Sequence, residues 1–355
     1  MEEVKGGFVT TFRPRSIAVL LLAFAYSAPA QVDPPPPPPP GRLIDIGGRK
    51  LHLYCAGDGS PSVILETGAG SFSIDWALVQ PEVAKTTRVC SYDRAGYGWS
   101  DPGPEWDTVT QVANDLETAL SKAGEHPPYL LVGQSMGGLF ARWFQHEHPD
   151  QVAGVVLVET YETTAPVNGK QVPLYTLTKD QLQANLPPPS SLKKPPLPTE
   201  VHPPFDKLPP SLQPTHLWLE RHFFETLDFN KGPQMMESWR SAFSILHQAS
   251  LKQGSLDALP LAILTREDVT EDERQQQREL SHLSSRCIWE IAVHSGHFVQ
   301  LERPDLVINA IRGVIRSAER PRKALSLERA PVNETVPSEG IPLWPPSEPR
   351  TTIRK

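Results

Sequence analysis

The chain has 355 residues, of which 39% are hydrophobic, and this is enough apolar material for one large domain or two small ones. Its formal net charge is −7 and the sequence contains no basic stripe, which argues against nucleic-acid binding. Proline is over-represented, with 39 residues against about 5% in an average protein. The prolines cluster at 34–40, 187–214 and 342–349, so they mark segments outside the core.

The first 30 residues have the composition of an export signal. Basic residues up to Arg15 precede an apolar stretch over 17–26, and Ala28-Pro29-Ala30 matches a cleavage site of the A-x-A type. Because this stretch is shorter than the ~20 residues of a membrane span, we predict a cleaved signal peptide over 1–30 and a secreted or periplasmic protein. An uncleaved N-terminal membrane anchor is the alternative. After signal cleavage we expect no integral membrane span.

The next segments divide by composition into a spacer and a core. Residues 31–42 are proline-rich and predict a stiff, extended spacer. Residues 43–160 and 257–318 alternate short apolar strands with amphipathic helices, which predicts an α/β fold with a mostly parallel, doubly wound sheet. Strands are predicted over 51–54, 63–65, 87–91, 129–132, 152–158, 261–264 and 287–293, and helices over 108–123, over the segment before Pro149 and over 306–315.

The alternating pattern breaks over 161–256. Residues 193–214 are too rich in proline for a regular element, whereas 210–227 and 234–248 have helical periodicity. These two predicted helices carry large apolar side chains, among them Trp218, Phe223, Phe224, Trp239 and Phe243. Residues 319–355 mix charge with proline and are predicted to be disordered.

The cysteines predict no metal site. The sequence has three, Cys55, Cys90 and Cys287, and neither a C-x-x-C nor an H-x-x-x-H spacing. An exported chain tolerates a disulfide, so a Cys55–Cys90 bridge is one open pairing that the sequence does not decide.

Residues 129–138, Tyr-Leu-Leu-Val-Gly-Gln-Ser-Met-Gly-Gly, are the most informative segment. An apolar strand leads into G-x-S-x-G at 133–137, and a helical pattern follows. A serine on a sharp turn between a strand and a helix is a nucleophile elbow. The flanking glycines suit a strained turn that neighbouring chains approach closely, and the helix N-terminus favours developing negative charge.

Three further segments resemble enzymes of the α/β-hydrolase fold superfamily. Arg88–Ser100 is similar to their R-V-x-x-Y-D-R-x-G-x-G-x-S stretch, and Val63–Gly70 with Trp76 is similar to their third strand and oxyanion loop. Ser295-Gly296-His297-Phe298, followed by Glu302-Arg303-Pro304, resembles the segment of their catalytic histidine. The resemblance covers 43–160 and 257–316, in the branch of serine esterases, lipases and proline aminopeptidases. It implies that 161–256 forms a helical cap after strand 6, with some of the apolar residues named above lining an acyl pocket.

The resemblance also implies a catalytic triad. Ser135 is the predicted nucleophile and His297 the predicted base, since a serine hydroxyl needs a base within hydrogen-bonding reach. Two carboxylates compete for the third position. Glu159 directly follows strand 6, where relatives of this type often carry aspartate, and Asp268 follows strand 7, the commoner position in the superfamily. We favour Glu159 and keep Asp268 as the alternative.

The remaining expectations concern the oxyanion hole and the reaction. Backbone N–H groups of Met136 and Ala69 are the predicted donors to the oxyanion. The serine in the elbow excludes haloalkane dehalogenases and epoxide hydrolases of this fold, which attack with aspartate. We expect an exported serine hydrolase that cleaves a small carboxylic ester through an acyl-enzyme, without cofactor or metal. An amide or peptide hydrolase and a non-catalytic binding protein of the same fold are the alternatives.

Overall fold

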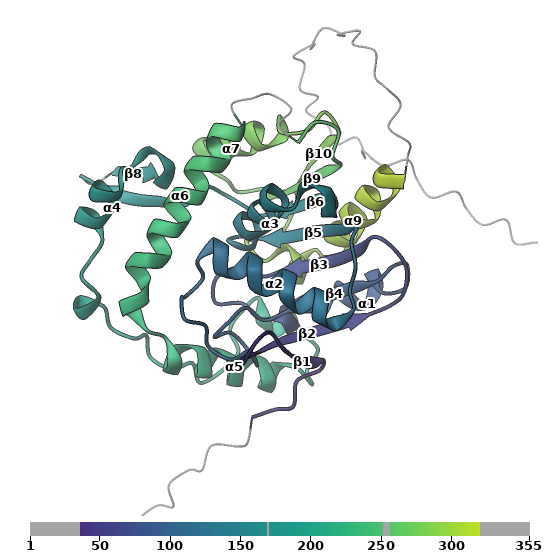
Figure 1. The fold of residues 1–355 in the computed structure, drawn as a ribbon, viewed down its shortest axis with the longest axis horizontal. Helices are drawn as coiled ribbons and strands as arrows, with labels where there is room; N and C mark the ends of the chain where they lie inside the picture. Colours follow the sequence, from purple (N-terminus) through teal and green to yellow (C-terminus); the bar gives the residue numbers. More distant parts are fainter. Residues whose placement is uncertain (1–35, 169, 251–255, 320–355) are drawn as a thin grey trace, which may run out of the picture. The chain divides into compact units, whose positions relative to one another are not determined.

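The computed structural model describes residues 36–168, 170–250 and 256–319, so the predicted signal peptide and tail lie outside the described residues. An eight-stranded sheet has the order β1-β2-β4-β3-β5-β6-β9-β10 (Figure 1). Its first two pairings are antiparallel and the other pairings are parallel. The strands are β1 (Arg42–Asp45), β2 (Lys50–Ala56), β3 (Ser62–Glu66), β4 (Val89–Tyr92), β5 (Tyr129–Gln134), β6 (Val152–Val158), β9 (Leu261–Arg266) and β10 (Cys287–Ala292).

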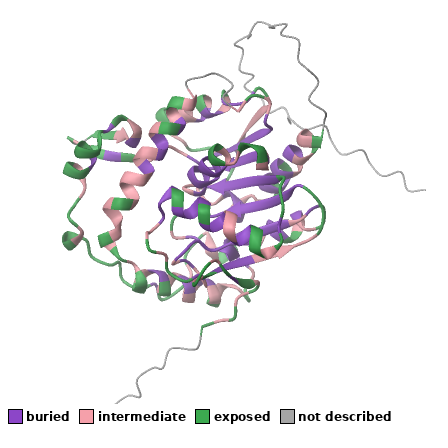
Figure 2. Cartoon of the chain, in the orientation of Figure 1, coloured by how far each residue is buried: buried purple, intermediate pink, exposed green. Residues whose placement is uncertain are grey.

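Both faces of the sheet are covered by helices. In β5, Leu131 packs on one face with α2 and α3, whereas Leu130 and Val132 pack on the other face with α9. This period of two follows from the alternating direction of side chains along a strand. Figure 2 shows the strands almost wholly buried between the helical layers. The core helices are α1 (Gln80–Val83), α2 (Val109–Ala123), α3 (Gly137–Glu147), α7 (Glu271–Ser281), α8 (Val299–Glu302) and α9 (Pro304–Glu319). The predicted α/β fold is therefore confirmed.

Four core elements were not predicted, namely β1, α1, α7 and α8. Strand β1 begins at Arg42, inside the predicted spacer, and pairs with β2. Helix α7 occupies the acidic segment after β9, and its capping box links the Thr270 side chain with the backbone of Glu273 and the Glu273 side chain with the backbone of Thr270. The T-x-x-E spacing at 270–273 was the signal that identifies this start.

The insertion between β6 and β9 is more varied than two helices. It begins with an antiparallel hairpin of β7 (Thr164–Val167) and β8 (Lys170–Pro173). The helices α4 (Lys179–Asn185), α5 (Gln213–Thr226) and α6 (Gly232–Ser250) follow, and the predicted helices correspond to α5 and α6. The short 3₁₀ turns of the chain are η1 (Ser73–Trp76), η2 (Pro149–Gln151), η3 (Leu174–Thr176), η4 (Pro189–Ser191), η5 (Phe205–Lys207) and η6 (Phe229–Lys231).

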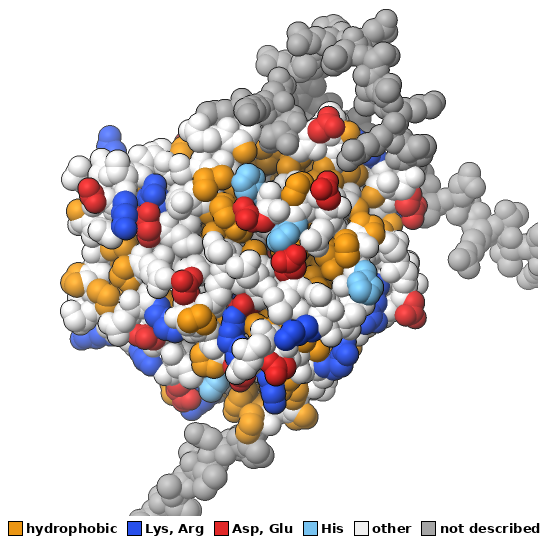
Figure 3. Space-filling view, in the orientation of Figure 1, with side chains coloured by type: hydrophobic (Ala, Val, Ile, Leu, Met, Phe, Trp, Pro, Cys, Tyr) orange, Lys and Arg blue, Asp and Glu red, His pale blue; other side chains and the backbone are white. Residues whose placement is uncertain are grey.

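Cys55 and Cys90 face each other across β2 and β4 and form a disulfide. Cys287 is free and half-buried, and burial raises the pKa of its thiol to about 12. None of the helices in the described part of the chain has both the length and the apolar character to cross a membrane. The face in Figure 3 carries acidic and basic side chains interspersed, without a continuous basic stripe.

Candidate active site

Ser135 lies at the sharp turn between β5 and α3. Its φ of 53° is in the left-handed region, which non-glycine residues seldom adopt. The turn is held by the Ser135 N–H, which donates to the Val158 carbonyl at 2.9 Å. Glycines are required on both sides, because a Cβ on Gly133 would lie 2.4 Å from the Gly137 carbonyl oxygen and one on Gly137 would lie 2.5 Å from that of Glu66. The local sequence therefore explains the elbow.

Glu159 is the carboxylate that the structure brings to His297. It directly follows β6, has a left-handed φ of 51° and is fully buried. Its N–H donates to the Leu264 carbonyl at 2.8 Å, so the neighbouring strand fixes its position. The Nδ1 atom of His297 lies 3.4 Å from Glu159 Oε2. The His297 side chain itself is 41% exposed.

Glu159 has further partners besides His297. The Arg266 side chain donates to Oε2, its backbone N–H donates to Oε1, and the Tyr161 hydroxyl donates to Oε1 at 2.8 Å. Burial opposes ionisation of Glu159, but the hydrogen bonds from His297, Arg266 and Tyr161 outweigh it and lower the pKa of the carboxyl. Glu159 is therefore an anion at neutral pH. Neither Arg266 nor Tyr161 was a predicted site residue.

Asp268 lies away from His297. Its side chain is exposed in the loop between β9 and α7, and its carbonyl accepts a hydrogen bond from Arg266 Nε at 3.0 Å. No contact between Asp268 and His297 is present, although both residues are in the described part of the chain. Of the two predicted acids, the geometry brings only Glu159 to the histidine.

The loop of His297 is tied to the elbow by two side chains that the sequence did not identify. Gln134, fully buried next to Ser135, donates from Nε2 to the His297 carbonyl at 3.0 Å. Glu302 accepts from the Gly296 N–H at 2.7 Å and so holds the turn before the histidine. Ser135 Oγ makes no hydrogen bond to any described residue, including His297. Catalytic hydrogen bonds of this kind often form only when substrate binds.

The loop after β3 passes directly against the elbow. A Cβ on Gly68 would lie 3.1 Å from Ser135 Cβ. Arg94 donates to the Thr67 and Gly68 carbonyls at 2.7 and 2.8 Å, from a buried position where it also pairs with Glu66 and Asp107. In a trans peptide the C=O and the following N–H point in opposite directions, so Arg94 turns the Ala69 N–H away from itself.

The two N–H groups predicted to form the oxyanion hole have no hydrogen-bond acceptor among the described residues. Neither the Met136 N–H nor the Ala69 N–H donates to an acceptor among the described residues. Ala69 is exposed and Met136 begins the first turn of α3. Both groups can therefore donate to a ligand oxygen, and the helix dipole adds partial positive charge at Met136.

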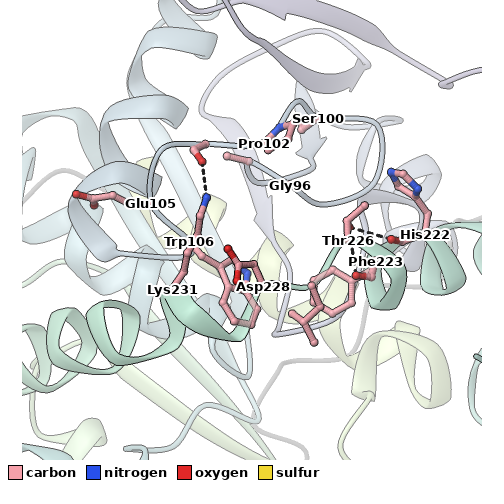
Figure 4. Close-up of a pocket in the computed structure, with 13 residues that line it drawn as sticks. Gly96, Ser100, Pro102, Glu105, Trp106, His222, Phe223, Thr226, Asp228 and Lys231 are labelled. Carbon is pink, nitrogen blue, oxygen red and sulfur yellow. Dashed lines mark hydrogen bonds between the residues drawn. The ribbon is translucent and has the colours of Figure 1, made fainter. Parts of the chain in front are cut away.

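The insertion contacts the loop after β3 through α5. His216 on α5 is buried, and its Nδ1 lies 2.9 Å from Asp75 Oδ1. Phe223 packs on Tyr97, with ring centroids 4.8 Å apart. Beside Phe223 a cavity of about 120 Å³ separates α5 from the loop after β4 (Figure 4), where Lys231 donates to the Gly103 carbonyl at 3.0 Å. Of the five apolar residues predicted to contribute to an acyl pocket, Phe223 is the one that lines this cavity.

The comparisons with known proteins decide the family. A family model described as alpha/beta hydrolase fold matches residues 61–304. The chain belongs to the α/β hydrolase fold family. It is 23% identical over 303 residues to an AB hydrolase superfamily protein of Gibberella zeae, across 72% of this chain and 86% of the relative. It is 36% identical over 126 residues to the probable transporter efuK of Hormonema carpetanum, across 33% of this chain and 18% of that protein.

The fold is shared with solved structures of this family. A thermophilic esterase from Thermogutta terrifontis superposes with a TM-score of 0.54 at 17% identity, covering 78% of this chain and 98% of the esterase. The matched segments span only 18% to 37% of the length of several curated relatives.

Potential metal ligands gather at one place among the described residues of this α/β hydrolase fold protein. The one group of potential ligands there is Cys55, Cys90 and Glu125. Its two sulfur atoms are bonded to each other and offer no thiolate pair.

Proposed function

We propose that the protein is an exported serine hydrolase that cleaves carboxylic esters through an acyl-enzyme. The observation that carries the proposal is the contact of His297 with the buried Glu159, next to a strained serine elbow whose Gln134 is bonded to the histidine loop. An imidazole oriented by a carboxylate and adjacent to a hydroxyl on a sharp turn is the arrangement that activates serine.

The roles follow from the chemistry of the groups. Ser135 Oγ attacks the ester carbonyl while His297 Nε2 accepts its proton, and Glu159 stabilises the imidazolium through Nδ1–H. The carbonyl oxygen becomes an oxyanion, which accepts hydrogen bonds from the N–H groups of Met136 and Ala69. His297 then gives its proton to the alkoxide that leaves. Water, deprotonated by His297, attacks the acyl-enzyme, and the acid is released as Ser135 regains its proton.

Export is supported by two separate features. The first is the signal-like sequence over 1–30, which lies outside the described residues. The second is the Cys55–Cys90 disulfide, because disulfides persist in oxidising compartments such as the periplasm or the extracellular space.

The test is the loss of activity on removal of the nucleophile. We expect Ser135→Ala to abolish hydrolysis of p-nitrophenyl esters and labelling by a fluorophosphonate probe, with a loss of about 10⁴-fold or more. Ser191→Ala, at an exposed serine of η4, is the matched control and should keep full activity. If Ser135→Ala retains more than about a tenth of the activity, the assignment is wrong.

A panel of substrates separates the alternatives. Aryl esters of increasing acyl length and aryl amides, including proline amides, are compared by kcat/KM. A preference for amides would replace the ester by the peptide or amide alternative. A folded wild-type protein without activity or probe labelling would favour a binding protein of this fold.

A further inference from the structure

A cavity separate from Ser135 lies further along α3, at the side of the sheet that α6 covers. Its volume is about 260 Å³, and it is bounded by α3, β6, the end of α6 and the segments at Leu256 and Leu283. At a rise of 1.5 Å per residue, Arg142 on α3 is about 10 Å further along the helix than the serine. The residues that line the cavity are Arg142, Gln145, His146, Pro149, Val155, Leu246, Ala249, Leu256 and Leu283.

Arg142 is the unusual member of this lining. It is only 7% exposed, yet its guanidinium makes no hydrogen bond and no ion pair with any described residue. The other buried arginine of the described chain, Arg94, is bonded to Glu66, Asp107 and two carbonyls. Burial disfavours the charged form and lowers the pKa of Arg142, yet none of its nitrogen atoms is both closed off from solvent and unpartnered, so its donors keep some contact with solvent. Arg142 therefore has free donors in a cavity that can hold their acceptor.

Glu162 is the negatively charged group that influences Arg142, but it does not satisfy the guanidinium. Glu162 acts on it electrostatically, but the two side chains do not form an ion pair. Burial raises the pKa of Glu162 to about 7, against the opposing effect of Arg142. At neutral pH Glu162 is only partly ionised, so much of the charge of Arg142 is left unbalanced.

The rest of the lining restricts what the acceptor is attached to. The side chains of Val155, Leu246, Leu256 and Leu283 give the cavity apolar walls, and the first two are fully or almost fully buried. A small hydrated anion such as phosphate or acetate would leave these walls in contact with water. An anionic head on an aliphatic chain satisfies both the guanidinium and the walls.

We propose that this cavity binds an aliphatic carboxylic acid of medium chain length, with its carboxylate on Arg142 and its chain against the leucine and valine side chains. A water molecule takes up about 30 Å³ in the liquid, so 260 Å³ holds roughly nine atoms of that size, which corresponds to an acid of about six to eight carbons. The planar guanidinium fits a carboxylate through two parallel hydrogen bonds. The proposal does not depend on the esterase assignment, since no residue of the cavity is in the proposed triad.

The experiment is calorimetric titration of the full-length protein with octanoate, with acetate and octan-1-ol as probes for the head and the chain alone. We expect saturable binding of octanoate at one site, and binding at least about tenfold weaker for each of the other two. Arg142→Met, which keeps the apolar stem but removes the charge, should weaken octanoate binding by at least about tenfold. Arg278→Met, at a half-exposed arginine of α7 outside the cavity, is the matched control and should bind octanoate like the wild type.

A second variant covers the case in which Arg142→Met does not fold. Ala249→Phe places a ring in the cavity from a half-exposed position on α6 and should also abolish octanoate binding. The same titration of Ser135→Ala should match the wild type, because the cavity is independent of the nucleophile. The proposal is overturned if the wild type shows no saturable binding up to about 10 mM octanoate, or if a folded variant at position 142 or 249 binds it unchanged. Unchanged binding would place the acid elsewhere, for example beside Ser135.

Discussion

At the scale of single residues, Glu159 is the residue of the candidate site with the most hydrogen-bond partners described above, namely His297, Arg266 and Tyr161. Its left-handed backbone directs a fully buried side chain toward His297, while Arg266 and Tyr161 bind its two oxygens. In the proposed mechanism Glu159 orients the histidine, and its bonds to Arg266 and Tyr161 also make it a structural anion. The two roles are separable by experiment, because catalysis and stability respond to different partners.

The first prediction separates the two candidate acids by kinetics. Glu159→Gln should lower kcat by about 10³ to 10⁴, with a smaller effect on KM, because the imidazolium of His297 loses its counter-charge. Asp268→Asn should stay close to the wild type, since its side chain is exposed, and should change stability by less than about 0.5 kcal/mol. Steady-state kinetics on one activated ester is the measurement. The reverse pattern would assign the acid to the loop after β9 and leave the roles of Ser135 and His297 unchanged.

The second prediction concerns the acid dependence of stability. The pKa of Glu159 is lowered in the folded protein, so its contribution to the free energy of unfolding is present above the unfolded pKa of about 4.3. It is lost as the pH falls through the lower, folded pKa. Between pH 6 and pH 3 the wild type should therefore lose more stability than Glu159→Gln, by about 1.4 kcal/mol for each unit of pKa depression. Urea unfolding of both proteins across this range tests it, and parallel curves would contradict it.

At the scale of elements, the insertion between β6 and β9 has two parts with different environments. Helix α6 packs on the core: Phe243 is only 1% exposed, and Trp239 Nε1 donates to the Asp107 carbonyl at 2.6 Å. Helix α5 contacts the loops near the site through Phe223 and His216. The sequence showed the apolar side chains of both helices but gave no means to separate these environments, because the hydrophobic pattern is the same in each.

The third prediction follows from this division. Phe243→Ala should reduce the free energy of unfolding by about 3 to 5 kcal/mol, because it leaves a cavity in the core, and it should leave the preference for acyl length unchanged. Phe224→Ala, at a partly exposed position on α5, should cost clearly less stability. Urea denaturation and the ester panel give the two readings. A change of acyl preference in Phe243→Ala without loss of stability would place that side chain in the substrate pocket.

At the scale of the whole molecule, the described residues form the hydrolase-fold core with its insertion, and the location of the protein depends on the segment before them. The predicted signal peptide and spacer begin outside the described residues, so export stays a prediction from sequence. The disulfide between β2 and β4 is the structural feature that agrees with an oxidising compartment.

The fourth prediction tests this location directly. The mature protein from its native host should begin at Gln31 and be recovered outside the cytoplasm, because Ala28-Pro29-Ala30 provides the cleavage site. Intact-mass measurement after cell fractionation checks both points. A chain that retains Met1 in the soluble cytoplasmic fraction would contradict export, and one that retains it in the membrane fraction would support the anchor.

The sequence by itself determined those structural features that depend only on residues close together along the chain. The strand, the glycines and the helix around Ser135 are all within one decapeptide, so the elbow was predictable, as were most strands and the fold class. The start of helix α7 is encoded in the same local way, by the T-x-x-E capping box at 270–273. Local patterns of this kind need no knowledge of the fold.

Only the tertiary structure decided which distant groups meet. Glu159 reaches His297 and Asp268 does not, because β6 and β9 end side by side and the loop after β9 turns Asp268 outward. The bond from Gln134 to the histidine loop likewise joins segments far apart in sequence. Such contacts depend on strand order and on the direction in which each loop leaves the sheet, and these are properties of the packed molecule rather than of any local stretch.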